Sequence, residues 1–197
     1  MKKPLLIVIL AIIIPLIYLI ISNYNNIPKL DENVKEKWSQ VQNQYKRRAD
    51  LIPNLVATVK AYAEHEKSTF TEVTEARSKV SQININADTL NNPAAMQQFS
   101  NAQAGLSSAL SKLMVVVEKY PELKANENFL ALQSQLEGTE NRITVARKDF
   151  IESVKVYNLE LRTMPGKLVA AIVHPSAQVR ETFTASEAEQ EATKVQF

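Results

Sequence analysis

The feature that most constrains the fold is a helical repeat of apolar residues sustained over a long stretch of the chain. Between Val34 and Val80, apolar side chains recur mostly at steps of three and four residues, which places them along one side of an α-helix. Asp31 is the expected cap, with Glu32 in the first turn. Because the pattern continues beyond Pro53, we expect this proline to kink the helix rather than end it.

The same periodicity predicts two further long helices. One begins at Asn92, an N-cap followed by Pro93 at the first helical position, and stops at Pro121. The next is capped by Asn126 and carries its apolar stripe as far as Leu161. At 1.5 Å per residue this third helix measures about 55–60 Å.

The end of the chain predicts less regular structure. A short apolar run, Leu168 to Val173, indicates a short last helix, and residues 175–197 are expected to form a weakly ordered tail. No alternating strand pattern with turn signals occurs in the sequence. Amphipathic helices must bury their stripes against one another, so residues 27–174 predict an all-α, elongated antiparallel bundle of three long helices plus the short helix.

An apolar N-terminal run predicts a membrane anchor. From Leu5 to Ile21 there is no charge, and as a helix the run is about 25 Å long, at the short end of what crosses a bilayer core. A cleaved signal peptide is the alternative, because Lys2 and Lys3 precede the run, but the run exceeds the usual signal core and no A-x-A site follows. We therefore expect residues 1–26 to remain as a single-pass anchor. The closest charges favour a bundle outside the cytoplasm.

Composition excludes several classes of function. Apart from Lys2 and Lys3 the basic and acidic side chains balance, because Lys and Arg total 23 and Asp and Glu total 21, so nucleic-acid binding is not expected. The chain has no Cys, 2 His and 3 Gly, so a thiolate or di-iron metal site and a glycine-rich phosphate loop are not expected. His65 has no second histidine four residues away, as a zincin site would need. No catalytic constellation can be assembled, so we expect no enzymatic activity, no cofactor and no metal.

Charged residues point toward the expected core. Arg48 falls in the apolar arc of the first long helix, and Glu140 and Arg147 lie near the centre of the stripe of the third. Because an unpaired buried charge costs several kcal/mol, these residues, with Asp50, are expected to pair across helices. The pairing predicts either a network that fixes helix register or a ligand or partner site near Pro53.

Two other groups of residues are candidate partner surfaces. A polar face of the first long helix is either simply solvated or a docking face for a partner helix. It comprises Lys46, Arg47, Asn54, Thr58 and His65. At the C-terminus, Val195 and Phe197 form an apolar-x-apolar pattern of the kind bound by strand addition, although random tails match such a short pattern often.

Several segments together resemble the signature of the LemA family. In the first long helix the resemblance rests on Tyr45 to Val56 (YKRRADLIPNLV), and in the third on Gly138 to Ile143 (GTENRI). It continues through Thr58-Val59-Lys60, Tyr62 to Glu66, Ala76-Arg77, Val145-Ala146-Arg147, Tyr157-Asn158 and Pro165-Gly166. The similarity covers nearly the whole chain, including the N-terminal run. Ala61 departs from the family's usual glycine, and the stretch around His174 lacks its Gly-Phe pair.

The resemblance implies a bacterial, membrane-anchored bundle of long helices with no enzymatic activity. Relatives of this family are often encoded beside membrane metalloproteases or other envelope proteins, which suggests a role in envelope homeostasis. Our leading hypothesis is therefore an interaction scaffold that associates with itself or with other envelope proteins. The alternative is a sensor that binds a small anion or ion at Arg48, Glu140 and Arg147.

Overall fold

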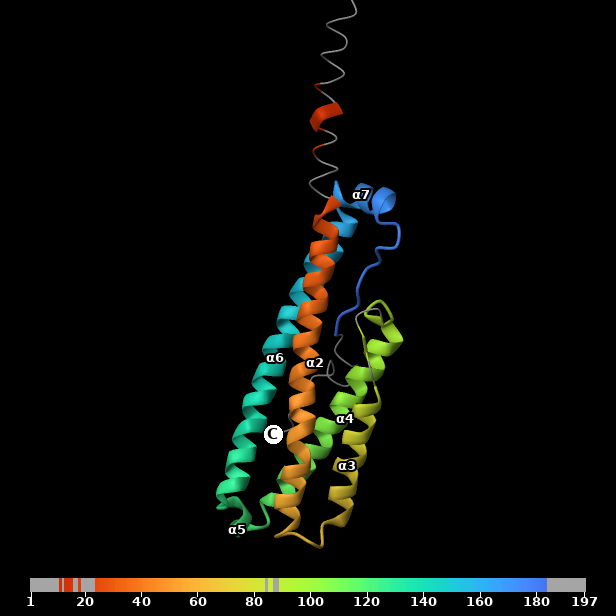
Figure 1. Ribbon diagram of the computed structural model, residues 1–197. Helices are drawn as coiled ribbons and strands as arrows, with labels where there is room; N and C mark the ends of the chain where they lie inside the picture. The colour runs from red at the N-terminus through yellow and green to blue at the C-terminus, as the bar shows by residue number, and fades with distance from the viewer. Residues whose placement is uncertain are drawn as a thin grey trace, which may run out of the picture.

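The computed structural model describes residues 24–83, 85, 86 and 89–183, together with residues 11, 13–15 and 18. This part of the chain contains helices and no strand, which confirms the all-α class (Figure 1). The helices are α2 (Asn26–Lys60), α3 (Lys67–Gln82), α4 (Pro93–Val117), α5 (Pro121–Lys124), α6 (Glu127–Arg162) and α7 (Gly166–Val173).

The first long helix is shorter than its apolar stripe predicts. It continues through Pro53 but ends at Lys60, and after a turn α3 runs back antiparallel to α2, so the prediction of one helix to Val80 is wrong (Figure 1). The turn, 61–66, contains no glycine and no proline, and Ala63 within it is buried in the same core as the stripe. The stripe therefore continues across a chain reversal, and four long helices stand where three are expected.

The predicted helix starts are confirmed at two positions and wrong at one. Asn92 accepts a hydrogen bond from the Ala95 amide, and Asn126 accepts one from the Phe129 amide, at 3.2 and 3.0 Å. In contrast, α2 begins at Asn26, so Asp31 lies inside the helix instead of capping it. The helix can begin before Pro28 because the amides of the first helical turn make no intrahelical hydrogen bond that a proline would remove.

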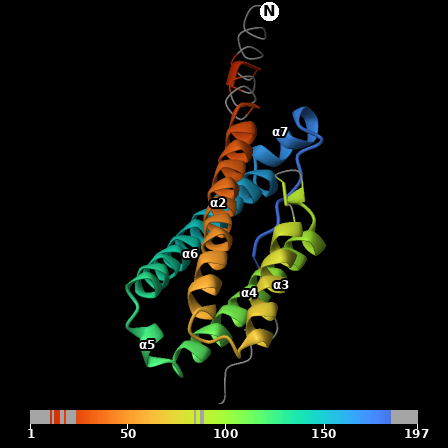
Figure 2. The ribbon, with the colours of Figure 1, turned by 60° about the horizontal axis from the view of Figure 1, so that its bottom comes forward.

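Two antiparallel pairs build the bundle, α2 with α6 and α3 with α4. Seen from both directions, α2 lies between α6 on one side and α3 and α4 on the other (Figures 1 and 2). The helices α2 and α6 have 35 and 36 residues, about 52 Å at 1.5 Å per residue, whereas α3 and α4 have 16 and 25. One pair therefore extends well beyond the other.

The core divides into two hydrophobic clusters along the bundle axis. The aliphatic cluster, around the α2–α3 turn and α5, includes Leu55, Val59, Val73, Leu106, Leu113, Leu123 and Leu136. The aromatic cluster, toward the start of α2, includes Trp38, Tyr45, Phe99, Phe150 and Tyr157. Ile85 and Leu90, from the connection between α3 and α4, also belong to the aromatic cluster.

The segment 175–183 packs against the aromatic cluster. The sequence predicts a weakly ordered tail for these residues instead. The Asn158 side chain exchanges two hydrogen bonds of 2.8 Å with the backbone of Arg180. The Glu181 amide donates to the Leu90 carbonyl, also at 2.8 Å. Phe183 packs on Trp38, with ring centroids 6.0 Å apart. This first part of the predicted tail is thus a specific component of the fold.

The predicted anchor and the C-terminal residues lie mostly beyond what can be described. None of the helices that the structure describes combines the length and the apolar composition needed to cross a bilayer. The run Leu5–Ile21 lies outside the described residues apart from isolated positions, and Val195 and Phe197 lie outside them as well.

Candidate functional site

A polar layer separates the two hydrophobic clusters. Arg48 of α2 and Gln103 of α4 are 2% and 5% exposed, and Arg48 donates hydrogen bonds to both Gln103 and the third member, Glu140 of α6. The aliphatic cluster ends on these helices at Ile52, Leu106 and Leu136, and the aromatic cluster begins at Tyr45, Phe99 and Ile143. Each helix thus contributes one polar position at the same level of the bundle.

Arg48 is the centre of this layer. Its Nη1 donates to Glu140 Oε1 at 2.7 Å and to Ser107 Oγ at 3.0 Å, and its Nη2 donates to Gln103 Oε1 at 2.5 Å. The guanidinium carbon lies 5.2 Å from the centroid of the Tyr45 ring. Nε is buried without a hydrogen-bond partner. The Glu140 carboxylate therefore supplies the charge that makes a fully buried arginine tolerable.

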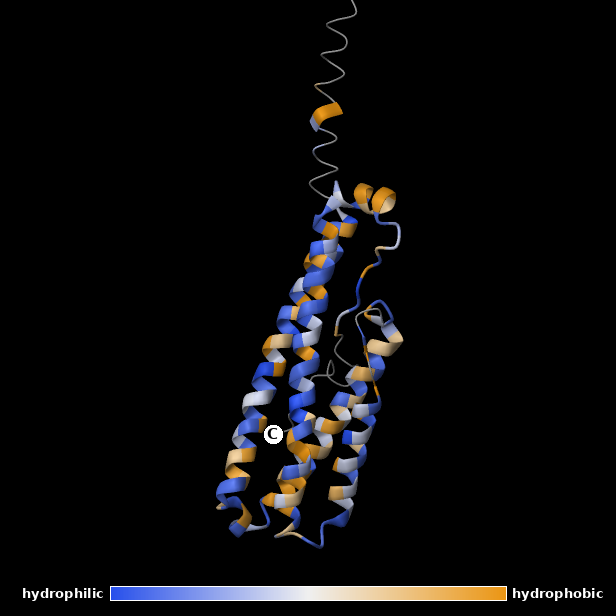
Figure 3. Ribbon diagram, in the orientation of Figure 1, coloured by the Kyte–Doolittle hydropathy of each residue, from blue (hydrophilic) through white to orange (hydrophobic). Residues whose placement is uncertain are grey.

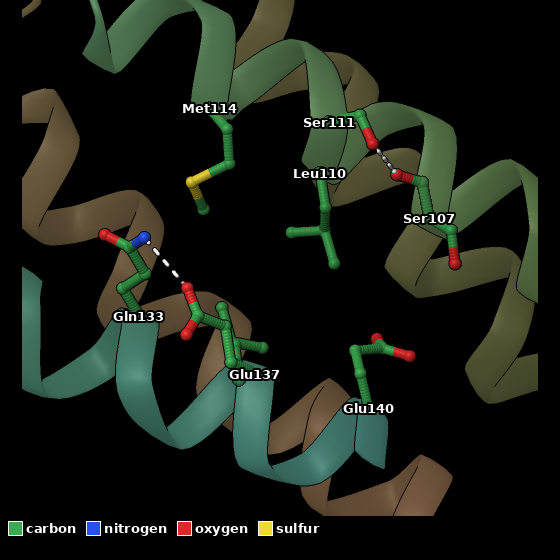
Figure 4. A pocket seen from close by; sticks show the side chains of 8 residues that line it. Ser107, Leu110, Ser111, Met114, Gln133, Glu137 and Glu140 are labelled. Atoms are coloured by element: carbon green, nitrogen blue, oxygen red, sulfur yellow. Dashed lines mark hydrogen bonds between the residues drawn. The ribbon is translucent and has the colours of Figure 1, made fainter. Parts of the chain in front are cut away.

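Glu140 lies at the edge of a groove between α4 and α6. Its side chain is 47% exposed, and these two helices do not pack closely on each other. The groove has a volume of about 320 Å³, and Figure 4 shows Leu110 and Met114 pointing across it toward Glu137 and Glu140. Gln133 donates to Glu137 along the opposite rim at 2.9 Å. Water in the groove consequently reaches the carboxylate that neutralises Arg48.

Asp50 and Arg147 do not join the Arg48 pair. Asp50 is exposed on α2, and Arg147 lies about two turns beyond Glu140 on α6. The Arg147 guanidinium stacks on Phe183, with Cζ 4.4 Å from the ring centroid. Burial raises the pKa of the Tyr45 hydroxyl, while the Arg147 and Arg48 guanidinium groups act to lower it. Arg147 thus connects the layer to the segment 175–183.

Four of the five residues of the predicted partner face lie on α2, and the fifth lies beyond its end. Lys46, Arg47 and Asn54 are exposed on α2, and Thr58 is half-buried with its hydroxyl bonded to the Asn54 carbonyl at 2.9 Å. His65 is exposed in the turn after α2. It cannot share a helix face with the others, because the helix ends at Lys60.

Sequence reasoning missed Gln103 and a second ion pair, which is partly buried. Arg180 Nη2 lies 2.8 Å from Asp31 Oδ1, joining residues separated by 149 positions. The apolar stripe of the helix that contains Gln103 has a gap between Phe99 and Leu106, and the stripes of the other two helices have similar gaps at Arg48 and Glu140. This gap could have identified Gln103 from the sequence. No local pattern marks Arg180.

Within 24–83, 85, 86 and 89–183, no three His, Asp or Glu side chains converge as a metal site. Some of the exposed charges form ion pairs, such as Lys35 with Glu32 at 2.7 Å. The polar layer and the adjoining groove are the features that distinguish this bundle.

The described chain is therefore a long helical bundle whose two cores are joined by a buried arginine. It belongs to the LemA family, whose family model matches residues 37–197. The chain is also similar to magnetosome protein MamQ 2 of Paramagnetospirillum magneticum, with 24% identity over 81% of this chain and 65% of the relative. Magnetosome protein MamQ of Magnetospirillum gryphiswaldense is 25% identical over 78% of this chain and 62% of the relative. The chain thus spans less than two thirds of the length of these relatives.

Proposed function

We propose that the chain is a single-pass protein of the cell membrane whose bundle is a non-enzymatic interaction scaffold outside the cytoplasm, with a role in envelope homeostasis. Membership of the LemA family and similarity to magnetosome proteins fit a membrane-associated, non-enzymatic role. The observation that carries the proposal is the length of α2, which begins soon after the run Leu5–Ile21 and continues for 35 residues. Such a helix holds a partner surface between Lys46 and Asn54 about 30–40 Å from its start.

A topology experiment tests the membrane part of this proposal. A compartment-sensitive reporter is fused after Phe197, and the mature protein is examined for retention of residues 1–21. Reporter activity outside the cytoplasm together with an intact N-terminus is the expected result. A cytoplasmic signal would reverse the proposed orientation, and a cleaved N-terminus would remove the anchor.

The exposed face of α2 is the proposed partner surface, for a second copy or another envelope protein. Lys46 and Arg47 give it positive charge, and Asn54 extends it along the same helix. A photo-crosslinking residue at Arg47 is expected to capture a partner in intact cells. The matched control is Lys155, a 71% exposed cation on α6. Equal crosslinking at both positions would mean non-specific contact and would exclude this face.

A separate deletion addresses the C-terminal residues. Removing Val195 to Phe197 should abolish partner recovery and leave the fold intact if these residues dock to a protein in the envelope. Unchanged recovery would exclude them as a docking motif.

The sensor alternative needs an anion to compete with the protein's own groups. Both Nη atoms of Arg48 already have oxygen partners, so an anion would have to displace Glu140 or use the unpaired Nε. The substitution Glu140→Gln distinguishes the two functions. A register network predicts the same loss of thermal stability with and without added phosphate, whereas a binding site predicts a change in stabilisation by phosphate.

A further inference from the structure

The short helix α7 lies at the end of the bundle where α2 begins (Figures 1 and 2). At the end of α7, His174 Nε2 lies 2.9 Å from the Tyr24 carbonyl oxygen, and the two rings are 5.3 Å apart. Tyr24 follows closely on the run Leu5–Ile21. The helix therefore sits beside the point where the chain leads into its most apolar segment.

Two opposite faces of α7 are apolar, and only one of them is covered. Gly166 and Val169 are buried, and Val169 packs in the aromatic cluster. On the other face Leu168 is 46% and Ile172 70% exposed. Met164, just before the helix, is 69% exposed. Figure 3 shows α7 as a mainly hydrophobic helix at this end of the molecule. Exposed apolar side chains gathered on one face commonly mark an interaction site, and no described residue covers this face.

The exposed charge around α7 is mainly positive, although the partly buried Glu160 carboxylate lies against Gly166. No Asp or Glu occurs from Leu161 to Arg180 or from Ser22 to Leu30. The exposed cations at this end are Lys29, Arg162 and Lys167. Anionic lipid headgroups attract such cations, and Lys and Arg keep their charge at headgroup level while their stems cover apolar surface.

We propose that α7 lies on the lipid surface next to the membrane anchor, with Met164, Leu168 and Ile172 inserted at the boundary between headgroups and acyl chains. Lys167 and Arg162 then lie among the phosphates. The inference rests on the proposed membrane anchorage and goes beyond it. The second contact with the bilayer restricts the tilt of the bundle more than a single point of attachment would.

The absence of cysteine from the chain allows a direct test. The full-length variants Ile172→Cys and Val115→Cys are each labelled with the fluorophore NBD and reconstituted in phosphatidylglycerol-containing vesicles. Val115 is the matched control, because it is an apolar residue, 62% exposed, near the opposite end of the bundle on α4. Quenching is measured with aqueous iodide and with lipids that carry a quencher on the acyl chain.

The expected result at position 172 is a blue-shifted NBD emission that is quenched by the lipid-borne quencher and not by iodide. At position 115 iodide should quench the probe and the lipid-borne quencher should not. Quenching by iodide at position 172 would overturn the proposal. Protection from iodide without lipid quenching would also overturn it, because a second copy would then cover the face. Alkaline extraction of cell membranes separates the two proposals. A chain that washes off refutes the anchorage itself, whereas a retained chain with an iodide-accessible probe refutes only the role of α7.

Discussion

The two hydrophobic clusters are built from different structural elements. In the aliphatic cluster all four long helices are present, and side chains such as Leu55, Val73 and Leu113 fill the space between them. In the aromatic cluster α4 contributes only Met96 and Phe99 from its first turns, and α7 contributes Val169. This cluster uses larger side chains and recruits Ile85 and Phe183 from non-helical segments. Because α3 contributes no buried residue there, connections become part of the core.

The largest expected effect is in the aromatic cluster. Trp38 is 1% exposed, its Nε1 donates to the Ile85 carbonyl at 2.9 Å, and its ring contacts Phe99, Phe150 and Phe183. Trp38→Ala should lower the free energy of unfolding by about 3–5 kcal/mol, measured by chemical denaturation. It should also raise amide exchange in residues 175–183, because Phe183 loses its support.

The matched change in the aliphatic cluster is Leu113→Ala. Leu113 is fully buried on α4, so a loss of about 2–5 kcal/mol is expected, with exchange in 175–183 unchanged at native pH. Equal exchange in the two variants would show that the clusters unfold as one unit and would remove the distinction between them.

The polar layer predicts an intermediate effect. Arg48→Ala leaves a cavity and an unpaired Gln103 side chain, and should cost about 2–4 kcal/mol. Glu140→Gln retains an acceptor for Nη1 but removes the charge that neutralises the buried guanidinium, and should cost about as much as Arg48→Ala. The measurement is urea denaturation of both variants. A loss below about 1 kcal/mol for Glu140→Gln would mean that water in the groove, and not the carboxylate, compensates the charge of Arg48.

The smallest expected effect concerns the ion pair that holds the segment 175–183. Burial acts to raise the pKa of Asp31, but hydrogen bonds from Arg180 and Lys35 outweigh it, so the pKa is lower in the folded than in the unfolded chain. The pair therefore stabilises the fold above the unfolded pKa of about 3.9, and this contribution is lost as the pH falls through the folded pKa.

The substitution Asp31→Asn should accordingly reduce stability at neutral pH by about 1 kcal/mol and make the acid part of the stability curve less steep. Glu32→Gln is the control, because Glu32 is 73% exposed and pairs only within its own helix with Lys35. Identical acid profiles for Asp31→Asn and the unsubstituted chain would show that Asp31 is not the group that couples the segment to the bundle.

Much of the bundle follows from local patterns in the sequence. The starts at Asn92 and Asn126 and the helix after Gly166 were predictable, because capping and apolar periodicity act over a few residues. The inward direction of Arg48 was predictable for the same reason. The turn at 61–66 was not, since it has neither glycine nor proline and its buried residue, Ala63, preserves the apolar pattern.

The sequence by itself determined that the described chain is helical and that Arg48 faces the core. Only the tertiary structure decided that Arg48 pairs with Glu140, that Arg147 instead stacks on Phe183, and that Arg180 binds Asp31. The physical reason is distance along the chain. These ion pairs join residues 92 and 149 positions apart, and their formation depends on how the helices and the segment 175–183 pack together, which periodicity within one helix does not encode.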